Sequence, residues 1–210
     1  MPLETGSLLS GSLDFLLSLT CLAIAVASAR AANDYLFHGF LWVAAAAFVG
    51  AMNLGGLTWT NDTHRWLSAV ATGPGMLLLG LGVFGATFGR VRAARWIAPA
   101  ISISSAGLIF FLWQAKSPRL EAVTMGMVVV LLIALLVLAV QAFRSGSTLA
   151  AGPALGAIGL LLFVGFGVSK VPLASDGLIH HDDVVHVVLV ACYVLVWLGV
   201  RGVSARGIRG

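Results

Sequence analysis

The chain has 210 residues and a mass of 21.8 kDa; hydrophobic residues make up 60% of it, charged residues 10%, and its mean hydropathy is +1.02. Soluble domains are about 45–50% apolar and about 25% charged. Twelve basic and eight acidic side chains could not cover a soluble surface of this size. Disorder is excluded as well, because it needs low hydrophobicity and many charges.

The apolar residues form long unbroken runs, whereas the strands of a membrane β-barrel would alternate apolar and polar residues. A membrane helix needs about 20 apolar residues. We therefore expect an all-α, polytopic membrane protein, with residues 1–210 forming a single seven-helix transmembrane domain. Gly73-Pro74-Gly75 predicts a kink in the third span, because proline lacks the backbone donor. The predicted spans are Leu8–Ala29, Leu36–Trp59, Trp66–Phe88, Ala94–Gln114, Leu120–Phe143, Thr148–Val168 and His181–Val203.

The basic residues are divided unequally between the two sides of the predicted bundle. Most of them lie in short loops, a distribution that does not indicate nucleic-acid binding. Cytoplasmic loops of membrane proteins carry the excess of Lys and Arg. The distribution predicts an N-terminus outside and a C-terminus in the cytoplasm, as expected for the plasma membrane of a bacterium. The inner side would hold Arg30, Arg90, Arg92, Arg95, Arg144, Arg201, Arg206 and Arg209, and the outer side Arg65, Lys116, Arg119 and Lys170.

Asp14 is the first ionisable residue inside a predicted span. Ser10, Asp14, Ser18 and Cys21 follow at intervals of three or four residues, which places them on one helix face. A polar stripe of this kind faces the interior of a helix bundle. Asp14 is therefore a candidate catalytic residue, and a structural hydrogen-bond node is the alternative.

Further polar residues lie at three other span ends on the same outer side. Asn53 lies near the end of the second span, and His64 precedes the third. The seventh span opens with a cluster of His181, Asp182, Asp183 and His186; Asp182 and His186 are four residues apart and share a helix face. An N-cap would explain one acid, and His64 could be an ordinary loop histidine.

Together these residues predict one polar layer in the outer half of the membrane. Imidazole and carboxylate ligands suit zinc, which lowers the pKa of a bound water. We expect His64, His181, Asp182 and His186 to hold the metal. Asp14 and Asn53 would then position water or substrate as the catalytic pair.

Seven spans with these polar positions resemble the CREST superfamily, which includes the alkaline ceramidases and the progestin and adipoQ receptors. The segment IHHDDVVHVVLVACYVLVWLGVRG and the first-span segment SLDFLLSL resemble an uncharacterised bacterial branch. Asn53 stands where the family has histidine, His64 lies near its aspartate position, and Asp182 and His186 take the places of its two span-seven histidines.

The resemblance implies a zinc-dependent hydrolase that cleaves a lipid amide or ester, with the bilayer and an amphiphilic small molecule as its partners. A receptor, a sensor or a small proton- or ion-coupled transporter could use the same layer. Haem bound between His64 and His186 is a third possibility. A retinal protein is disfavoured, because Lys116 and Lys170 both lie at span ends.

The predicted orientation can be tested with fusions to the C-terminus. We expect an alkaline phosphatase fusion to be inactive and a green fluorescent protein fusion to be fluorescent, because the inner loops carry more basic residues. The reverse pattern would place the polar layer on the cytoplasmic side and contradict the predicted topology.

Overall fold

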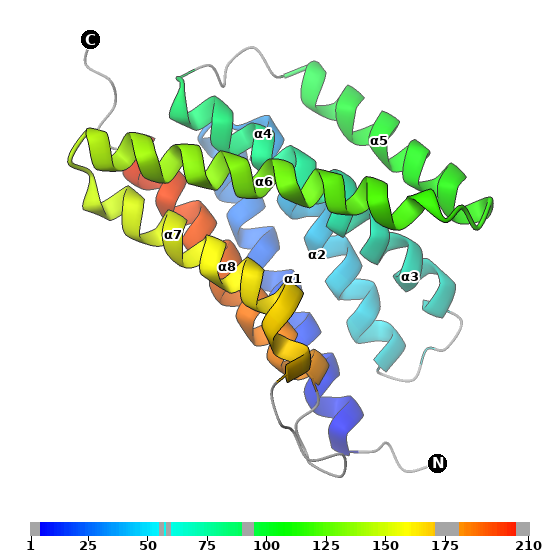
Figure 1. Ribbon diagram of the computed structural model, residues 1–210. Helices are drawn as coiled ribbons and strands as arrows, with labels where there is room; N and C mark the ends of the chain where they lie inside the picture. The colour runs from blue at the N-terminus through cyan, green and yellow to red at the C-terminus, as the bar shows by residue number, and fades with distance from the viewer. Residues whose placement is uncertain (1–4, 55–56, 58–59, 90–94, 171–180, 205–210) are drawn as a thin grey trace.

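The computed structural model describes residues 5–54, 57, 60–89, 95–170 and 181–204, and most of these are helical. Figure 1 shows the helices as one bundle. The elements in chain order are α1 (Thr5–Arg30), α2 (Asp34–Leu54), α3 (Asn61–Val70), the π-helical turn η2 (Ala71–Gly75), α4 (Met76–Thr87), α5 (Ile97–Gln114), α6 (Arg119–Arg144), α7 (Thr148–Leu162), the π-helical turn η4 (Phe163–Gly167), the 3₁₀ turn η5 (Val168–Lys170) and α8 (His181–Ser204).

Seven of the helical stretches in the described residues are long and apolar enough to cross a membrane. The stretch from α3 through η2 to α4 makes one of them, and α7 with η4 makes another. The predicted all-α fold with seven spans is confirmed, and the chain has the make-up of a multi-pass membrane protein. We call the end where α1, α3, α6 and α8 begin the site end, and the other the opposite end.

Two predicted span boundaries differ from the structure near the site. The second span ends at Leu54 instead of Trp59, and the third begins at Asn61 instead of Trp66. Asp62 then lies in the first helical turn, where a carboxylate is favoured by the helix dipole. His64 is consequently a helix residue. The predicted start of the fourth span at Ala94 lies outside the described residues.

The kink predicted at Gly73-Pro74-Gly75 is present as the π-helical turn η2. Pro74 has no N–H to donate, and a π turn absorbs the missing bond within a continuous span. A second π-helical turn, η4, ends the α7 span, and no proline in the sequence marks it.

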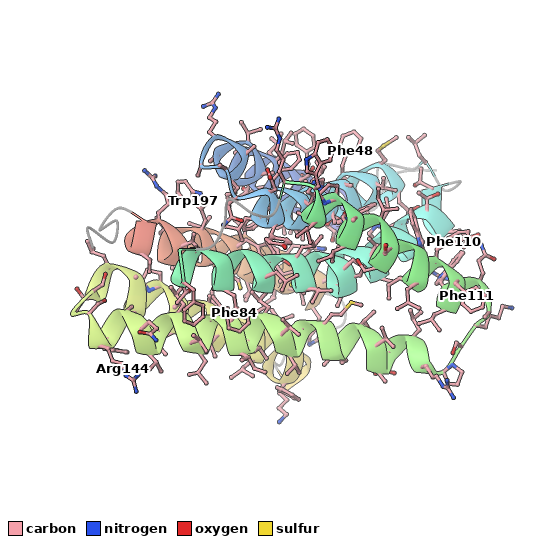
Figure 2. All side chains as sticks on the ribbon, turned by 90° about the horizontal axis from the view of Figure 1, so that it is seen from above. Phe48, Phe84, Phe110, Phe111, Arg144 and Trp197 are labelled. Atoms are coloured by element: carbon pink, nitrogen blue, oxygen red, sulfur yellow. The ribbon has the colours of Figure 1, made fainter. Side chains whose placement is uncertain are left out.

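The core is built mainly from apolar side chains of α1, α2, α4, α6, α7 and α8. Phe40 of α2 and Tyr193 of α8 are buried and meet edge to face, with ring centroids 5.9 Å apart. Large apolar side chains also cover the outside of the bundle, as Figure 2 shows for Phe48, Phe110 and Phe111. Such a surface suits contact with lipid chains.

Glycines allow the closest helix contacts. A Cβ added to Gly82 of α4 would lie 2.6 Å from Leu36 Cγ and 2.9 Å from Leu36 N at the start of α2. The second of these atoms belongs to the backbone, so α2 itself would have to move.

We expect Gly82→Ala to lower the free energy of unfolding by about 1–3 kcal/mol, the usual cost of overpacking. Gly126→Ala in α6 is the matched control, because a Cβ there meets nothing within 4 Å. Thermal unfolding of the purified protein in detergent measures both. Equal melting temperatures for the two variants would show that α2 and α4 are less tightly packed than the structure indicates.

Candidate functional site

Two polar side-chain contacts connect α1 to α8 at the site end. Asp14 Oδ1 lies 3.0 Å from His186 Nε2, and one turn nearer the start of α1 the Ser10 hydroxyl donates a hydrogen bond to Asp183 Oδ1. Asp14 is 2% exposed and Asp183 is 2% exposed, so both carboxylates are removed from water. The predicted polar face of α1 is therefore present, and its partner is α8.

The spacing of residues on the two helices explains why both contacts form. Ser10 and Asp14 are four residues apart on α1, and Asp183 and His186 are three apart on α8, so each pair shares a face of its helix. A carboxylate at mid-span without a partner costs about 2.5–3.5 kcal/mol on insertion scales. His186 provides the partner for Asp14.

Gly50 of α2 leaves room for the His64 side chain beside Asp14. A Cβ added to Gly50 would lie 2.5 Å from Asp14 Oδ2 and 2.8 Å from His64 Cε1. The two side chains therefore face each other across the space that a larger residue would fill. The Nδ1 of His64, a residue of α3, lies 3.3 Å from the carbonyl oxygen of Ala46 in α2. This contact does not involve Nε2.

Two cavities meet at these side chains. Asp14, His64, Val185 and His186 line both of them. The polar cavity, of about 310 Å³, is completed by Ser10, Asn53, Leu54 and Asp182. The apolar cavity, of about 330 Å³, extends into the bundle to Leu17, Met76 and Tyr193 and outward to Met125, Val128, Val164 and Gly165. Both volumes are typical of small-molecule sites, which span about 300–1,000 Å³.

The structure brings five of the six predicted site residues together at one cavity. Asp14, Asn53, His64, Asp182 and His186 all line the polar cavity. His181 is exposed at the start of α8 and does not line either cavity. Of the two adjacent acids, Asp183 is the buried one and Asp182 is exposed, so the acid in contact with α1 is the neighbour of the predicted one.

Gly50 and Val185 were missed by sequence reasoning, although both line or shape the site. An isolated glycine in an apolar helix has many possible roles, and only the neighbouring helices reveal this one. The position of Gly50, one turn before Asn53, was the one available signal.

The predicted metal ligands do not form a coordination group in this arrangement. Among the described residues, no group of three or more His, Cys, Asp or Glu side chains could hold a metal ion. His186 Nε2 is in contact with Asp14, His181 is exposed and lines neither cavity, and Asp182 is exposed at the edge of the polar cavity. The predicted set of four therefore does not fit zinc as it stands, and bound zinc stays a prediction.

One buried atom of the pair has no partner. His186 Nδ1 makes no hydrogen bond within the described part of the chain. Because a carboxylate only accepts, the tautomer that donates Nε2–H to Asp14 leaves Nδ1 unprotonated. In that tautomer the pair holds an unprotonated ring nitrogen beside the two cavities.

Fold and site together define a seven-helix protein with the make-up of a multi-pass membrane protein, which holds a carboxylate–imidazole pair between a polar and an apolar cavity. The chain belongs to DUF6962, a family of unknown function, whose model matches residues 10–205. The match includes every residue of the site described above. Comparison with curated proteins and with solved structures finds no match.

The contribution of Asp14 to stability can be separated from its chemistry. We expect Asp14→Leu to lower the free energy of unfolding by about 1–3 kcal/mol, because the half-buried His186 loses its partner. Asp14→Asn keeps the shape and one hydrogen bond and should cost less. Thermal unfolding in detergent measures both changes.

Asp62→Leu is the control, because Asp62 is an exposed acid in the first turn of α3 and its removal should cost only the helix-dipole contribution, about 0.3–1 kcal/mol. If Asp14→Leu were as stable as wild type, the contact with His186 would not contribute to the packing of α1 on α8.

Proposed function

We propose that this protein is an intramembrane hydrolase that cleaves an amide or ester bond in a membrane lipid. The observation that carries the proposal is the position of the Asp14–His186 pair in the common wall of the polar and apolar cavities. An amphiphile would place its headgroup in the first cavity and its acyl chain in the second. Its cleavable link would then lie beside the pair.

The chemistry assigned to the pair is general acid–base catalysis. Asp14 accepts a hydrogen bond from His186 Nε2–H and so fixes the orientation and tautomer of the ring, as a carboxylate does in an Asp–His–nucleophile triad. His186 Nδ1 takes a proton from water as the water oxygen attacks the carbonyl carbon. The same proton then passes to the departing alcohol or amine. Since Nδ1 is buried, water reaches it only when substrate binding shifts the ring or its neighbours.

His64 and Asn53 complete the polar cavity. The His64 ring faces the second oxygen of Asp14, and its Nδ1 contact with Ala46 holds it in place. Asn53 lines the same cavity with an amide group that can donate and accept. We assign both to the orientation of the headgroup or of the carbonyl that is attacked.

The acyl chain would enter sideways from the bilayer. The apolar cavity extends to Met125 and Val128 on α6 and to Val164 and Gly165 on the α7 span. Figure 1 shows α6 and α7 diverging from the turn that joins them, so their separation is widest at the site end. We propose this side of the bundle as the access route. In the predicted orientation it opens in the outer half of a bacterial plasma membrane.

A proton-coupled transporter is the main alternative, and the packing beyond Asp14 favours it less. Transport needs a polar route from the pair to the opposite end. The buried face of α1 continues instead with Leu17, Ser18, Cys21 and Ile24, and the Ser18 hydroxyl is occupied by a hydrogen bond to the carbonyl oxygen of Ala44. The resemblance to the CREST superfamily agrees with hydrolysis and stays a prediction.

The proposal is tested with purified protein in lipid vesicles that carry O-acyl or N-acyl lipids with a labelled acyl chain. We expect release of labelled fatty acid, and a loss of about 10²–10⁴-fold in rate for Asp14→Asn and His186→Gln, which is the usual contribution of acid–base catalysis. Asp34→Asn and His38→Gln are matched controls, because they remove the same residue types at the opposite end of the bundle.

Two results would contradict the proposal: no fatty acid released from any lipid of the panel, or equal rates for wild type and the Asp14 and His186 variants. A pH change inside the vesicles driven by an imposed gradient, and lost in the same variants, would establish the transporter instead.

Metal removal tests the zinc prediction on the same preparation. Because Asp14 and His186 already contact each other, we expect hydrolysis to persist after treatment with EDTA. Loss of the reaction with EDTA and its recovery with zinc would show that the reaction needs a metal. Elemental analysis of wild type and His186→Gln would then locate the ion.

A further inference from the structure

One wall of the apolar cavity carries polar side chains in a row. α3 and η2 contribute His64, Ser68, Thr72 and Met76, which follow one another at intervals of four residues and all line this cavity of about 330 Å³. Residues four apart on a helix share a face, and each such step advances about 6 Å along the axis. Ser68 and Thr72 therefore lie deeper in the bundle than His64. We call these two residues the hydroxyl strip.

The two hydroxyls of the strip have no partner within the protein. Serine and threonine inside a helix commonly bond to the carbonyl oxygen four residues earlier. Thr87, Ser105 and Thr124 do so in this chain. No side-chain hydrogen bond of Ser68 or Thr72 occurs within the described residues. Two hydrogen-bonding groups thus remain free in the wall of an apolar cavity.

A ligand can reach both hydroxyls of the strip. Ser68 is half-buried and Thr72 is exposed. The described residues contain fully buried serine oxygens without a partner at Ser28 and Ser147, and the oxygen of Ser68 is not one of them. The Ser68 hydroxyl is therefore open to a molecule in the cavity that it lines.

The surroundings of the strip favour a neutral polar group. Hydrocarbon side chains make up most of the cavity, among them Leu17, Val128 and Leu189. A charge is costly in such surroundings unless it is paired, and the described residues that line the cavity include no Lys or Arg to pair with an anion. A hydroxyl both donates and accepts a hydrogen bond. A hydroxyl on the ligand would therefore complement Ser68 and Thr72 without introducing a charge.

The strip does not continue across the bundle. The next residue on the same face is the buried Met76, whose sulfur lies 3.9 Å from the Tyr193 hydroxyl. Beyond it α4 continues with buried apolar residues such as Leu79 and Val83. The two hydroxyls therefore do not belong to a polar route to the opposite end, and their position suits a ligand held inside the cavity.

We propose that Ser68 and Thr72 bind a hydroxyl on the acyl chain of the substrate, so that hydroxyacyl lipids are the preferred substrate class. This inference rests on the proposed hydrolysis for the identity of the chain. With the cleavable link beside Asp14 and His186, the strip begins about one helical turn deeper, so the hydroxyl belongs to the first few carbons of the chain. A plain chain would leave both protein hydroxyls unpaired.

Binding can be measured apart from hydrolysis with long-chain methyl ketones, which keep the carbonyl group but have no bond to hydrolyse. One ketone is plain, and the others carry a hydroxyl on the second or fourth carbon beyond the carbonyl. Titration of purified full-length protein in detergent, followed by thermal unfolding, gives the affinity for each. The ratio of hydroxylated to plain affinity is compared between proteins, because this comparison cancels the different partition of the ketones into detergent.

We expect Ser68→Ala and Thr72→Val each to lower this ratio about three- to tenfold, because each removes one hydrogen bond to the ligand. Thr72→Ser keeps the hydroxyl and should retain the wild-type ratio. Ser105→Ala and Thr87→Val are the matched controls, because these hydroxyls bond within their own helices and do not line the cavity. If one variant of the strip does not fold, the other decides, since each hydroxyl is removed separately.

An equal ratio in wild type and in the variants of the strip, or no binding of any ketone, would overturn the proposal. Release of fatty acid from plain and hydroxyacyl lipids, measured in parallel, separates it from the proposed hydrolysis. A ratio that depends on the strip without any release of fatty acid would support the hydroxyl site and contradict the hydrolysis alone. Hydrolysis with a ratio that the variants leave unchanged would contradict the hydroxyl site alone.

Discussion

A carboxylate buried in an apolar span must find a partner inside the bundle, and Asp14 finds His186 at 3.0 Å. This requirement determines which faces of α1 and α8 meet. The neighbouring contact between Ser10 and Asp183 follows from the same register, one turn nearer the site end. Both cavities of the candidate site have their shared wall at this pair, so the contact that aligns two helices also positions the proposed chemistry.

The shape of the site depends on a glycine, which has no side chain, and on two π-helical turns, which depart from regular α-helical hydrogen bonding. Gly50 leaves the space in which Asp14 and His64 face each other. The π-helical turns η2 and η4 lie in the third and sixth spans, and residues of both line the apolar cavity. π-Helical turns are frequent at functional sites, because they redirect side chains without ending a helix. Here they occur in two of the walls that enclose the cavity.

The two ends of the bundle carry opposite chemistry. The site end presents acids and histidines around the polar cavity, whereas the opposite end presents exposed arginines among the described residues. The apolar core around Phe40 and Leu79 separates the two ends.

The sequence by itself determined the class of protein, the seven spans, the kink at Pro74 and the layer in which the polar residues gather. These follow from the length of apolar runs and from proline's missing donor, which are local properties. Only the tertiary structure decided that Asp183, not Asp182, is buried beside α1, that Asp14 pairs with His186, and that Gly50 makes room for His64. Adjacent residues on a helix point about 100° apart, so the rotation of α8 against α1 selects one acid over the other. That rotation is set by packing between residues more than 150 positions apart, such as Ser10 and Asp183. No local pattern in the sequence predicts it.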